Sequence, residues 1–172
     1  MRVFVTVGST KFDSLVQAVL SPEVIGSLRN KQYTELVIQC GNSESGSETN
    51  IQAGTETRFT TDGVNIVLWR FKPSLNDEFT TADLIISHAG SGTILDVLRT
   101  GKPLIVVPNP TLLDNHQEEL ASVLYGQGYL QYSTATNLAQ TITAFDGRKL
   151  TKFPPFDGAA FRAVVDQEMG FS

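Results

Sequence analysis

The chain has 172 residues, 41% of them hydrophobic and 18% charged, which suits one folded domain and excludes a disordered chain. Its formal net charge of −5 argues against a general nucleic-acid-binding protein, which needs a basic surface to neutralise phosphates. The charge still permits one phosphorylated ligand held by backbone amides. The single cysteine, Cys40, has no partner for an internal disulfide, which favours a reducing compartment.

The N-terminus and the apolar runs predict a soluble protein. A strand-like run starts at Arg2, and we expect no signal peptide before it. The longest apolar runs, such as Leu104–Val107, are too short to cross a bilayer. We therefore expect a cytoplasmic chain without a transmembrane segment, whose attachment to any membrane depends on a partner.

Strand-like and helix-like segments alternate along the chain. The expected strands are apolar runs at residues 2–7, 36–39, 64–69, 83–87 and 104–107. The expected helices are one capped by Asp13, one after Pro22, a short one capped by Ser74, and others over residues 93–99, 114–125, 138–145 and 158–169. Residues 41–50 are typical of a mobile surface loop, and Phe153-Pro-Pro-Phe156 is a break. This order predicts an α/β, Rossmann-like fold with a mostly parallel sheet and flanking helices.

In such folds, ligands bind where the strands end. Right-handed crossovers place the ligand crevice outside the carboxyl ends of the parallel strands. The loops that matter therefore follow strands, at residues 8–11, 41 onward, 70–73, 87–93 and 108–116.

The strongest chemical signal is the run Ser87-His88-Ala89-Gly90-Ser91-Gly92-Thr93, which follows an apolar strand and opens a helix. Glycines allow a ligand to approach the backbone, and the first amides of a helix lack internal partners and favour negative charge. A diphosphate fits such a site without a metal. The alternative is an ordinary strand-to-helix turn in which Ser91 or Thr93 is the cap.

Asp96 lies three and four residues beyond Thr93 and Gly92, on the same face of the expected helix. A carboxylate at this position can accept hydrogen bonds from both hydroxyls of a ribose. The alternative is a solvated acid near the start of the helix that complements its dipole.

Three other stretches are expected at the same edge. Asp114-Asn115-His116-Gln117 suits the recognition of sugar hydroxyls, although by itself it is better explained by Asp114 as an N-cap before an exposed first turn. Gly8-Ser9-Thr10 is a second glycine turn. Arg70-Phe71-Lys72-Pro73 ends a strand, where backbone groups could meet a base edge beside Phe71, although by itself Phe71 is better explained as a core aromatic.

Several known site types are absent from the sequence. The dinucleotide fingerprint would need glycines where Thr10 and Asp13 stand, and the second strand ends in Gln39-Cys40-Gly41 without an acid for an adenosine ribose. There is no Walker motif and no Asp-x-Asp pair, and the two histidines are not spaced as a metal pair. We therefore expect neither a metal nor a cofactor.

Taken together, these segments resemble the C-terminal half of two-domain (GT-B) N-acetylglucosaminyltransferases. The resemblance rests on four runs: Phe4–Thr10, Ile85–Asp96, Gly101–Val106 and Asp114–Gln117. It is strongest to the small soluble subunits of the eukaryotic two-subunit UDP-N-acetylglucosamine transferases of dolichol-linked oligosaccharide synthesis, whose bacterial relative is the single-chain enzyme that completes lipid II. It covers nearly the whole chain and is weakest over residues 42–62.

The resemblance implies roles for individual residues. Asp96 would hold the uridine ribose, where bacterial relatives carry Glu, and Phe71 would lie beside the uracil. His116 and Gln117 would recognise N-acetylglucosamine, although His116 stands where bacterial enzymes have Gln. His88 would contact the diphosphate or act as a local base, and we prefer the contact. The substrate-binding set is then Gly8, Ser9, Thr10, Phe71, Gly90, Ser91, Gly92, Thr93, Asp96, Asn115, His116 and Gln117.

The resemblance also implies that this chain is half of an enzyme. Residues 1–152 would form the UDP-sugar-binding α/β domain, and residues 153–172 a C-terminal helical segment. Phe161, Val164, Val165 and Glu168 recur at helical spacing there, for packing on the sheet or for contact with a partner. The partner would be a membrane-anchored subunit that binds a lipid-linked N-acetylglucosamine diphosphate at the cytosolic face of the endoplasmic reticulum, and it would supply the general base.

The implied reaction is an inverting, metal-independent hexosyl transfer that adds the second N-acetylglucosamine to N-acetylglucosaminyl-diphosphodolichol during N-glycan precursor synthesis. Two alternatives remain open. The chain could be a non-catalytic nucleotide-sugar-binding or regulatory module, or part of a two-chain polysaccharide transferase that uses another UDP-sugar.

Overall fold

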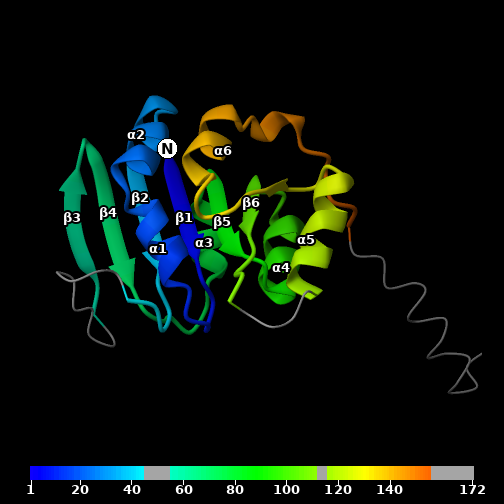
Figure 1. Ribbon diagram of the computed structural model, residues 1–172, viewed down its shortest axis with the longest axis horizontal. Helices are drawn as coiled ribbons and strands as arrows, with labels where there is room; N and C mark the ends of the chain where they lie inside the picture. Colours follow the sequence, from blue (N-terminus) through cyan, green and yellow to red (C-terminus); the bar gives the residue numbers. More distant parts are fainter. Residues whose placement is uncertain (45–54, 112–115, 156–172) are drawn as a thin grey trace, which may run out of the picture.

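A computed structural model of the chain describes residues 1–44, 55–111 and 116–155. Among these residues, seven strands form one sheet in the order β3-β4-β2-β1-β5-β6-β7 (Figure 1). β3 pairs antiparallel with β4, and every other neighbouring pair is parallel. The Rossmann-like, mostly parallel architecture predicted from the sequence is confirmed.

The elements have the following bounds. The strands are β1 Arg2–Thr6, β2 Glu35–Gln39, β3 Thr57–Thr61, β4 Val64–Trp69, β5 Leu84–His88, β6 Leu104–Val107 and β7 Gln131–Tyr132. The helices are α1 Asp13–Val19, α2 Pro22–Asn30, α3 Asn76–Thr81, α4 Ser91–Thr100, α5 His116–Gly126 and α6 Leu138–Ala144, followed by a short 3-10 helix at Gly147–Lys149.

Helices cover both faces of the sheet. α1, α2 and α6 pack on one face and α3, α4 and α5 on the other, which gives two apolar clusters (Figure 1). Successive side chains of β1 enter alternate clusters: Val3 and Val5 belong to the first and Phe4 to the second, all fully buried. Burial of each such side chain contributes about 1.5–3 kcal/mol to the stability of the fold. The central strands are therefore a rigid support for the loops that follow them.

The strand order reverses direction at β1. The chain goes from β1 to β2 on one side and returns, after β4, to β5 on the other side of β1. The carboxyl ends of β1 and β5 are therefore the topological switch point, where open α/β sheets bind ligands. Thr6 pairs with Ser87 in the register of these strands, so the turn after Thr6 and the turn after His88 lie next to each other.

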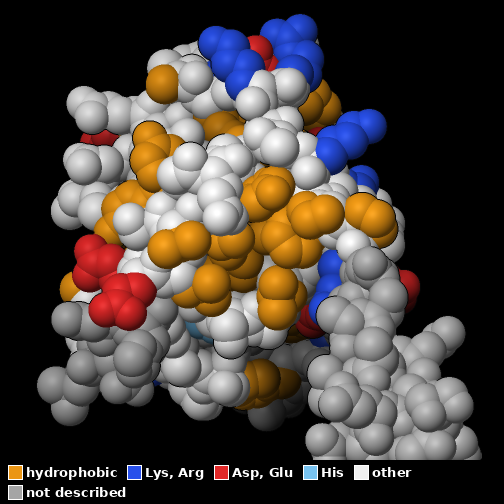
Figure 2. All heavy atoms as spheres, turned by 90° about the vertical axis from the view of Figure 1, so that its right-hand side faces the viewer, with side chains coloured by type: hydrophobic (Ala, Val, Ile, Leu, Met, Phe, Trp, Pro, Cys, Tyr) orange, Lys and Arg blue, Asp and Glu red, His pale blue; other side chains and the backbone are white. Residues whose placement is uncertain are grey.

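The two edge strands, β3 and β7, were not predicted. β3 is mainly exposed or half-buried, and β7 has only two residues, both half-buried. Neither carries the apolar run that marks the central strands, because an edge strand pairs on one side only. α5, with its exposed Val123 and Tyr125, lies at the β7 end of the sheet, and Figure 2 shows apolar side chains gathered on that face.

Two predicted helix caps were wrong. The N-cap of α1 is Phe12, and Asp13 is the first helical residue, whose Oδ1 accepts a hydrogen bond from the Glu44 amide at 2.9 Å. The N-cap of α3 is Leu75, although the Ser74 hydroxyl accepts a hydrogen bond from the Asn76 amide at 3.2 Å. Both side chains still satisfy backbone amides, but one residue away from the cap position.

The start of the predicted mobile loop is tied to the domain. Ser43 is 1% exposed, and its hydroxyl accepts a hydrogen bond from the Phe12 amide at 2.7 Å. Gly41 adopts a left-handed conformation, φ +53°, and a Cβ there would lie 2.5 Å from the Gly8 carbonyl oxygen. Residues 41–44 therefore pack against the turn after β1 and are not a free surface loop.

Other predictions fall on residues 45–54, 112–115 and 156–172, outside the described part of the chain. They are the rest of the loop 41–50, the start of a helix at Asp114, and the C-terminal helix with its stripe of Phe161, Val164, Val165 and Glu168. The boundary between residues 152 and 153 also stays a prediction. In the described segment, Phe153 packs edge-on against Tyr129, with 5.1 Å between ring centroids.

Candidate functional site

The imidazole of His88 occupies the space between the two glycine turns. His88 is the last residue of β5, not a loop residue as predicted, and it is 7% exposed. A Cβ on Gly8 would lie 2.5 Å from its Cε1, and a Cβ on Gly90 would collide with its Nε2. Only glycine leaves room for the ring at both positions, so the two turns and His88 form one packed unit at the switch point.

Burial determines the protonation of His88. Desolvation lowers the pKa of its imidazole below the usual value, an effect that the nearby Thr6 carbonyl partly opposes. Nδ1 lies 3.4 Å from the Thr6 carbonyl oxygen. In the chain without a ligand, the neutral form of the ring is therefore favoured at pH 7.

Hydrogen bonds to buried side chains hold the turn after β1. Gly8 has φ +66°, and its amide donates to Thr6 Oγ1 at 3.2 Å and to Gln39 Oε1 at 3.0 Å. The Gly8 amide is thus engaged and is not a free donor for a ligand. Ser9 is exposed, and the Thr10 hydroxyl donates to the Val7 carbonyl at 2.9 Å, so Ser9 is the residue that the turn presents to solvent.

The first turn of α4 is open to solvent. Its N-cap is Gly90, which has no side chain to accept from the first-turn amides, while Ser91 and Gly92 are exposed. The predicted alternative, a turn capped by Ser91 or Thr93, is not what the structure has. The uncapped amides and the helix dipole favour an anion here. Asp96 is exposed one turn farther along α4.

The aromatic residues at the end of β4 divide between core and surface. Trp69 is 2% exposed and stacks on Phe4 at 6.0 Å, whereas Phe71 is 51% exposed. The core interpretation of Phe71 was therefore wrong. The exposed ring of Phe71 can therefore stack against a planar ligand group at the carboxyl end of β4.

Two lysines near the strand ends, Lys11 and Lys72, are paired with acids. Lys11 lies 3.3 Å from Asp13 and 3.0 Å from Glu44, and these acids raise its pKa. Lys72 lies 2.8 Å from Glu78 and 3.3 Å from Glu56 and packs over the Trp69 ring. Because acids already balance these lysines, backbone amides are the better donors for a bound anion.

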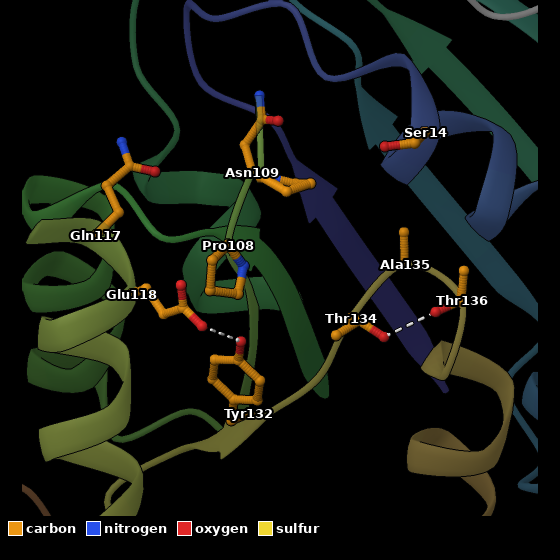
Figure 3. Close-up of a pocket in the computed structure, with 10 residues that line it drawn as sticks. Ser14, Pro108, Asn109, Gln117, Glu118, Tyr132, Thr134, Ala135 and Thr136 are labelled. Carbon is orange, nitrogen blue, oxygen red and sulfur yellow. Dashed lines mark hydrogen bonds between the residues drawn. The ribbon is translucent and has the colours of Figure 1, made fainter. Parts of the chain in front are cut away.

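A cavity of about 500 Å³ lies beside the start of α5 (Figure 3). Its lining combines prolines with hydroxyl, amide and carboxylate groups, from Ser14, Pro108, Asn109, Pro110, Gln117, Glu118, Tyr132, Thr134, Ala135 and Thr136. The Tyr132 hydroxyl donates to Glu118 at 3.3 Å, as Figure 3 shows. Sequence inspection missed the cavity, because it forms only where β6, β7, α1 and α5 come together.

The polar run before α5 is only partly visible. Asn115 lies outside the described residues, and His116 begins α5 without a described side chain. Gln117 is half-buried in the first turn, and its Oε1 is buried without a hydrogen-bond partner within the described part of the chain. Gln117 also lines the cavity, so it is the residue of this run that the described structure brings there.

Metal ligands and membrane-spanning helices are two further features that bear on function. Among residues 1–44, 55–111 and 116–155, no three His, Cys, Asp or Glu side chains are grouped to hold a metal ion. The helices in these same segments include none long and apolar enough to cross a membrane.

Comparison with known proteins places this geometry in a family. The family model of the glycosyltransferase family 28 C-terminal domain matches residues 2–167. The chain belongs to this family. The resemblance drawn from the sequence is thereby confirmed.

Relatives of this family 28 domain include proteins named UDP-N-acetylglucosamine transferase subunit ALG13. The UDP-N-acetylglucosamine transferase subunit ALG13 of Cryptococcus neoformans is 33% identical over 195 residues, which cover 98% of this chain and 96% of the relative. Human ALG13 is 40% identical over 132 residues, 77% of this chain and 11% of the relative. The chain thus spans nearly all of the fungal protein and about a tenth of the human one.

Solved structures agree on the fold of this family 28 domain. An NMR solution structure of ALG13 superposes with a TM-score of 0.69 at 30% identity, over 94% of this chain and 93% of that one. The crystal structure of Acinetobacter baumannii MurG has a TM-score of 0.66 at 18% identity and is covered over 49% of its length. At that identity, the MurG likeness shows the fold alone.

Proposed function

We propose that this chain is the donor-binding subunit of an N-acetylglucosaminyltransferase that adds the second N-acetylglucosamine to N-acetylglucosaminyl-diphosphodolichol. The observation that carries the proposal is the meeting of the Gly8 and Gly90 turns at the switch point, beside the uncapped start of α4. The names of the relatives, UDP-N-acetylglucosamine transferase subunits, support the donor and the reaction.

The donor would lie along the carboxyl edge of the sheet. Its diphosphate would accept hydrogen bonds from the amides of Ser91–Thr93, whose helix favours negative charge. Its ribose would reach the exposed carboxylate of Asp96, and its uracil would lie against Phe71. Its sugar would meet Gln117 together with Asn115 and His116. The order of the strands in the sheet supports this arrangement. The base contact follows β4, the phosphate contacts follow β5 and the sugar contacts follow β6, and β5 lies between β4 and β6 in the sheet.

The transfer would be an inverting displacement without a metal. The acceptor hydroxyl forms a bond to the anomeric carbon, the bond from that carbon to the diphosphate oxygen breaks, and UDP leaves. Negative charge grows on the leaving oxygen, and the first-turn amides of α4 are preorganised to stabilise it. The hydroxyl proton passes to a general base, which we assign to the partner because His88 is buried.

The proposal includes a membrane-anchored partner subunit. Those of the residues assigned to the donor that the structure describes lie at or beside the carboxyl edge of the sheet, and none of them is assigned to a lipid-linked acceptor. The partner would supply the acceptor side and hold this chain at the cytosolic face of the endoplasmic reticulum. The word subunit in the relatives' names supports a heteromeric enzyme.

The first test is a titration of UDP-N-acetylglucosamine into the purified chain, followed by amide NMR. It is run with and without the soluble domain of the candidate partner. Shifts at Ser91–Asp96 and Gln117 are expected, and the partner should strengthen the binding. An absence of shifts in both conditions would contradict the donor site.

A second measurement separates the alternatives. The reconstituted pair is assayed for transfer from UDP-N-acetylglucosamine and from UDP-glucose to a lipid-linked N-acetylglucosamine diphosphate. Transfer with a preference for UDP-N-acetylglucosamine is expected. Binding without transfer would instead identify a nucleotide-sugar-binding module, and a preference for UDP-glucose would identify a different transferase.

A further inference from the structure

The side chain of Gln39 connects three strand ends. Gln39 is the last residue of β2 and is 2% exposed. Its Nε2 donates to the Gly8 carbonyl and to the Arg70 carbonyl, each at 2.8 Å. Its Oε1 accepts from the Gly8 amide at 3.0 Å and from the Thr6 hydroxyl at 2.5 Å. Two donors and two acceptor positions are thus all occupied, which is the full capacity of the amide.

The segments that Gln39 joins are not neighbours in the sheet. β2 lies between β1 and β4, so the turn after β1 and the end of β4 have no direct strand pairing with each other. The Gly41 amide, which donates to the Arg70 carbonyl at 3.2 Å, adds a backbone link on the β4 side. Gln39 is the side chain that reaches both neighbours at once.

We propose that Gln39 is a positioning residue that sets the distance between the two walls of the donor site. One wall is the Gly8 turn, beside the diphosphate, and the other is the end of β4, beside the base. This inference rests on the proposed function. A nucleoside diphosphate spans both walls, so its affinity depends on their spacing, whereas a nucleoside alone reaches only one wall. A buried, fully satisfied hydrogen-bond network holds such spacing more firmly than two independent loops.

The neutral amide is the group that fits this position. A carboxylate in its place would keep the acceptor for Gly8 and Thr6 but could not donate to the two carbonyls, and it would bring negative charge towards a diphosphate. A leucine would remove all four of these bonds: the Gly8 amide would keep only Thr6 Oγ1, the Arg70 carbonyl would keep the Gly41 amide, and the Gly8 carbonyl would lose the amide of Gln39. In dinucleotide-binding folds, an acid at the end of the second strand reaches out to a ribose. Here the corresponding side chain turns inward.

The test compares ligands that reach one wall or both. Binding of UDP and of uridine is measured by titration calorimetry for the wild type, Gln39→Glu, Gln39→Leu and Thr6→Val, with the partner's soluble domain present if the wild type needs it. We expect UDP affinity to fall about tenfold or more in the Gln39 variants. Uridine affinity should change by less than about threefold, roughly 0.6 kcal/mol. Thr6→Val removes two hydrogen bonds, the one to Gln39 Oε1 and the one from the Gly8 amide, but leaves the two bonds donated by Gln39 Nε2, so it should shift UDP affinity in the same direction by less.

The control is Ser133→Ala, which removes a buried hydroxyl bonded to Thr141, away from the assigned donor contacts. It should leave both affinities unchanged. If Gln39→Leu does not fold, the affinities of Thr6→Val and Gln39→Glu for UDP and uridine still test the positioning role. Equal losses for UDP and uridine, or unchanged UDP affinity in folded variants, would overturn the positioning role alone. If the wild type binds no UDP even with the partner domain, the proposed function fails, and this inference fails with it.

Discussion

The Gly8 backbone and the His88 ring are in such close contact that a methyl group on Gly8 would lie 2.5 Å from Cε1 of the imidazole. The contact joins the end of β1 to the end of β5, two segments 80 residues apart in the chain. A Cβ on Gly90 would collide with the same ring. The shape of the switch point therefore depends on two positions that tolerate only glycine.

Replacement of Gly8 should therefore damage both the fold and ligand binding. Gly8→Ala places an L-residue at φ +66°, which costs about 1–2 kcal/mol, and it also forces the His88 ring to move. We expect a lower free energy of unfolding in urea and a loss of UDP binding. Gly90→Ala, at φ −70°, should show the collision with His88 without backbone strain.

Gly26→Ala is the matched control for these substitutions. Gly26 lies inside α2, and a Cβ there meets nothing within 4 Å. The substitution should raise the free energy of unfolding by up to about 1 kcal/mol, because alanine favours the helix, and should leave UDP binding unchanged. Equal stability of the Gly8→Ala and Gly26→Ala proteins would contradict the packing described for His88.

The lowered pKa of His88 predicts a pH dependence of stability. In the unfolded chain the imidazole takes up a proton near its ordinary pKa of 6.5, while in the folded chain it stays neutral to a lower pH. The unfolded state therefore binds more protons, and the free energy of unfolding should fall as the pH drops below 6.5 towards the folded pKa. Above pH 6.5, this contribution is fully present.

Urea unfolding at pH 7.5, 6.5 and 5.5 measures this dependence, with His88→Gln as the comparison. The difference in stability between wild type and variant should shrink as the pH falls. His116 is the other histidine and is present in both proteins, so its own titration cancels. A difference that stays constant across this range would mean that His88 is not buried as a neutral ring.

The sequence could predict the centre of this fold better than its edges. β1, β2, β4, β5 and β6 are buried on both faces and read as continuous apolar runs, so their positions were predicted to within a residue or two. β3 and β7 carry no such pattern, since their presence depends on pairing with a neighbour. Long-range pairing leaves no local signal in the sequence.

The same difference applies to the candidate site. The glycine turns were predicted to face one edge, and the structure brings Gly8 and Gly90 together around His88. The sequence could not predict that the His88 ring fills the space beside both glycine turns. It also could not predict that Gln39 links the Gly8 turn to the end of β4. Both features depend on contacts between segments that are distant in the sequence. Phe71 was misjudged because aromatic residues near strand ends are usually buried, whereas here Trp69 takes the core position.

Asp96 should contribute to UDP binding but not to stability. It is exposed on α4, so Asp96→Asn should change the free energy of unfolding by less than about 0.5 kcal/mol. If its carboxylate accepts from the ribose hydroxyls, UDP affinity should fall by about 1.5–3 kcal/mol, measured by calorimetry. Glu23→Gln, at an exposed acid in the first turn of α2, is the control and should leave UDP affinity unchanged.

A deoxyribose ligand makes the Asp96 test specific. 2′-Deoxy-UDP lacks one of the two hydroxyls, so the loss caused by Asp96→Asn should be smaller with this ligand than with UDP. The same loss with both ligands would show that Asp96 does not contact the 2′-hydroxyl.

Phe71 should contribute to UDP binding but little to stability, because half of its ring is exposed and it lies outside the core. Phe71→Ala should leave the free energy of unfolding within about 0.5 kcal/mol of the wild type, since the ring is 51% exposed. Loss of a stacked base should weaken UDP binding by about 1–3 kcal/mol. Phe59→Ala, on the edge strand β3 with a ring 37% exposed, is the matched control and should bind UDP normally. If both variants bind UDP like the wild type, the base does not lie against Phe71, and the end of β4 is not a wall of the site.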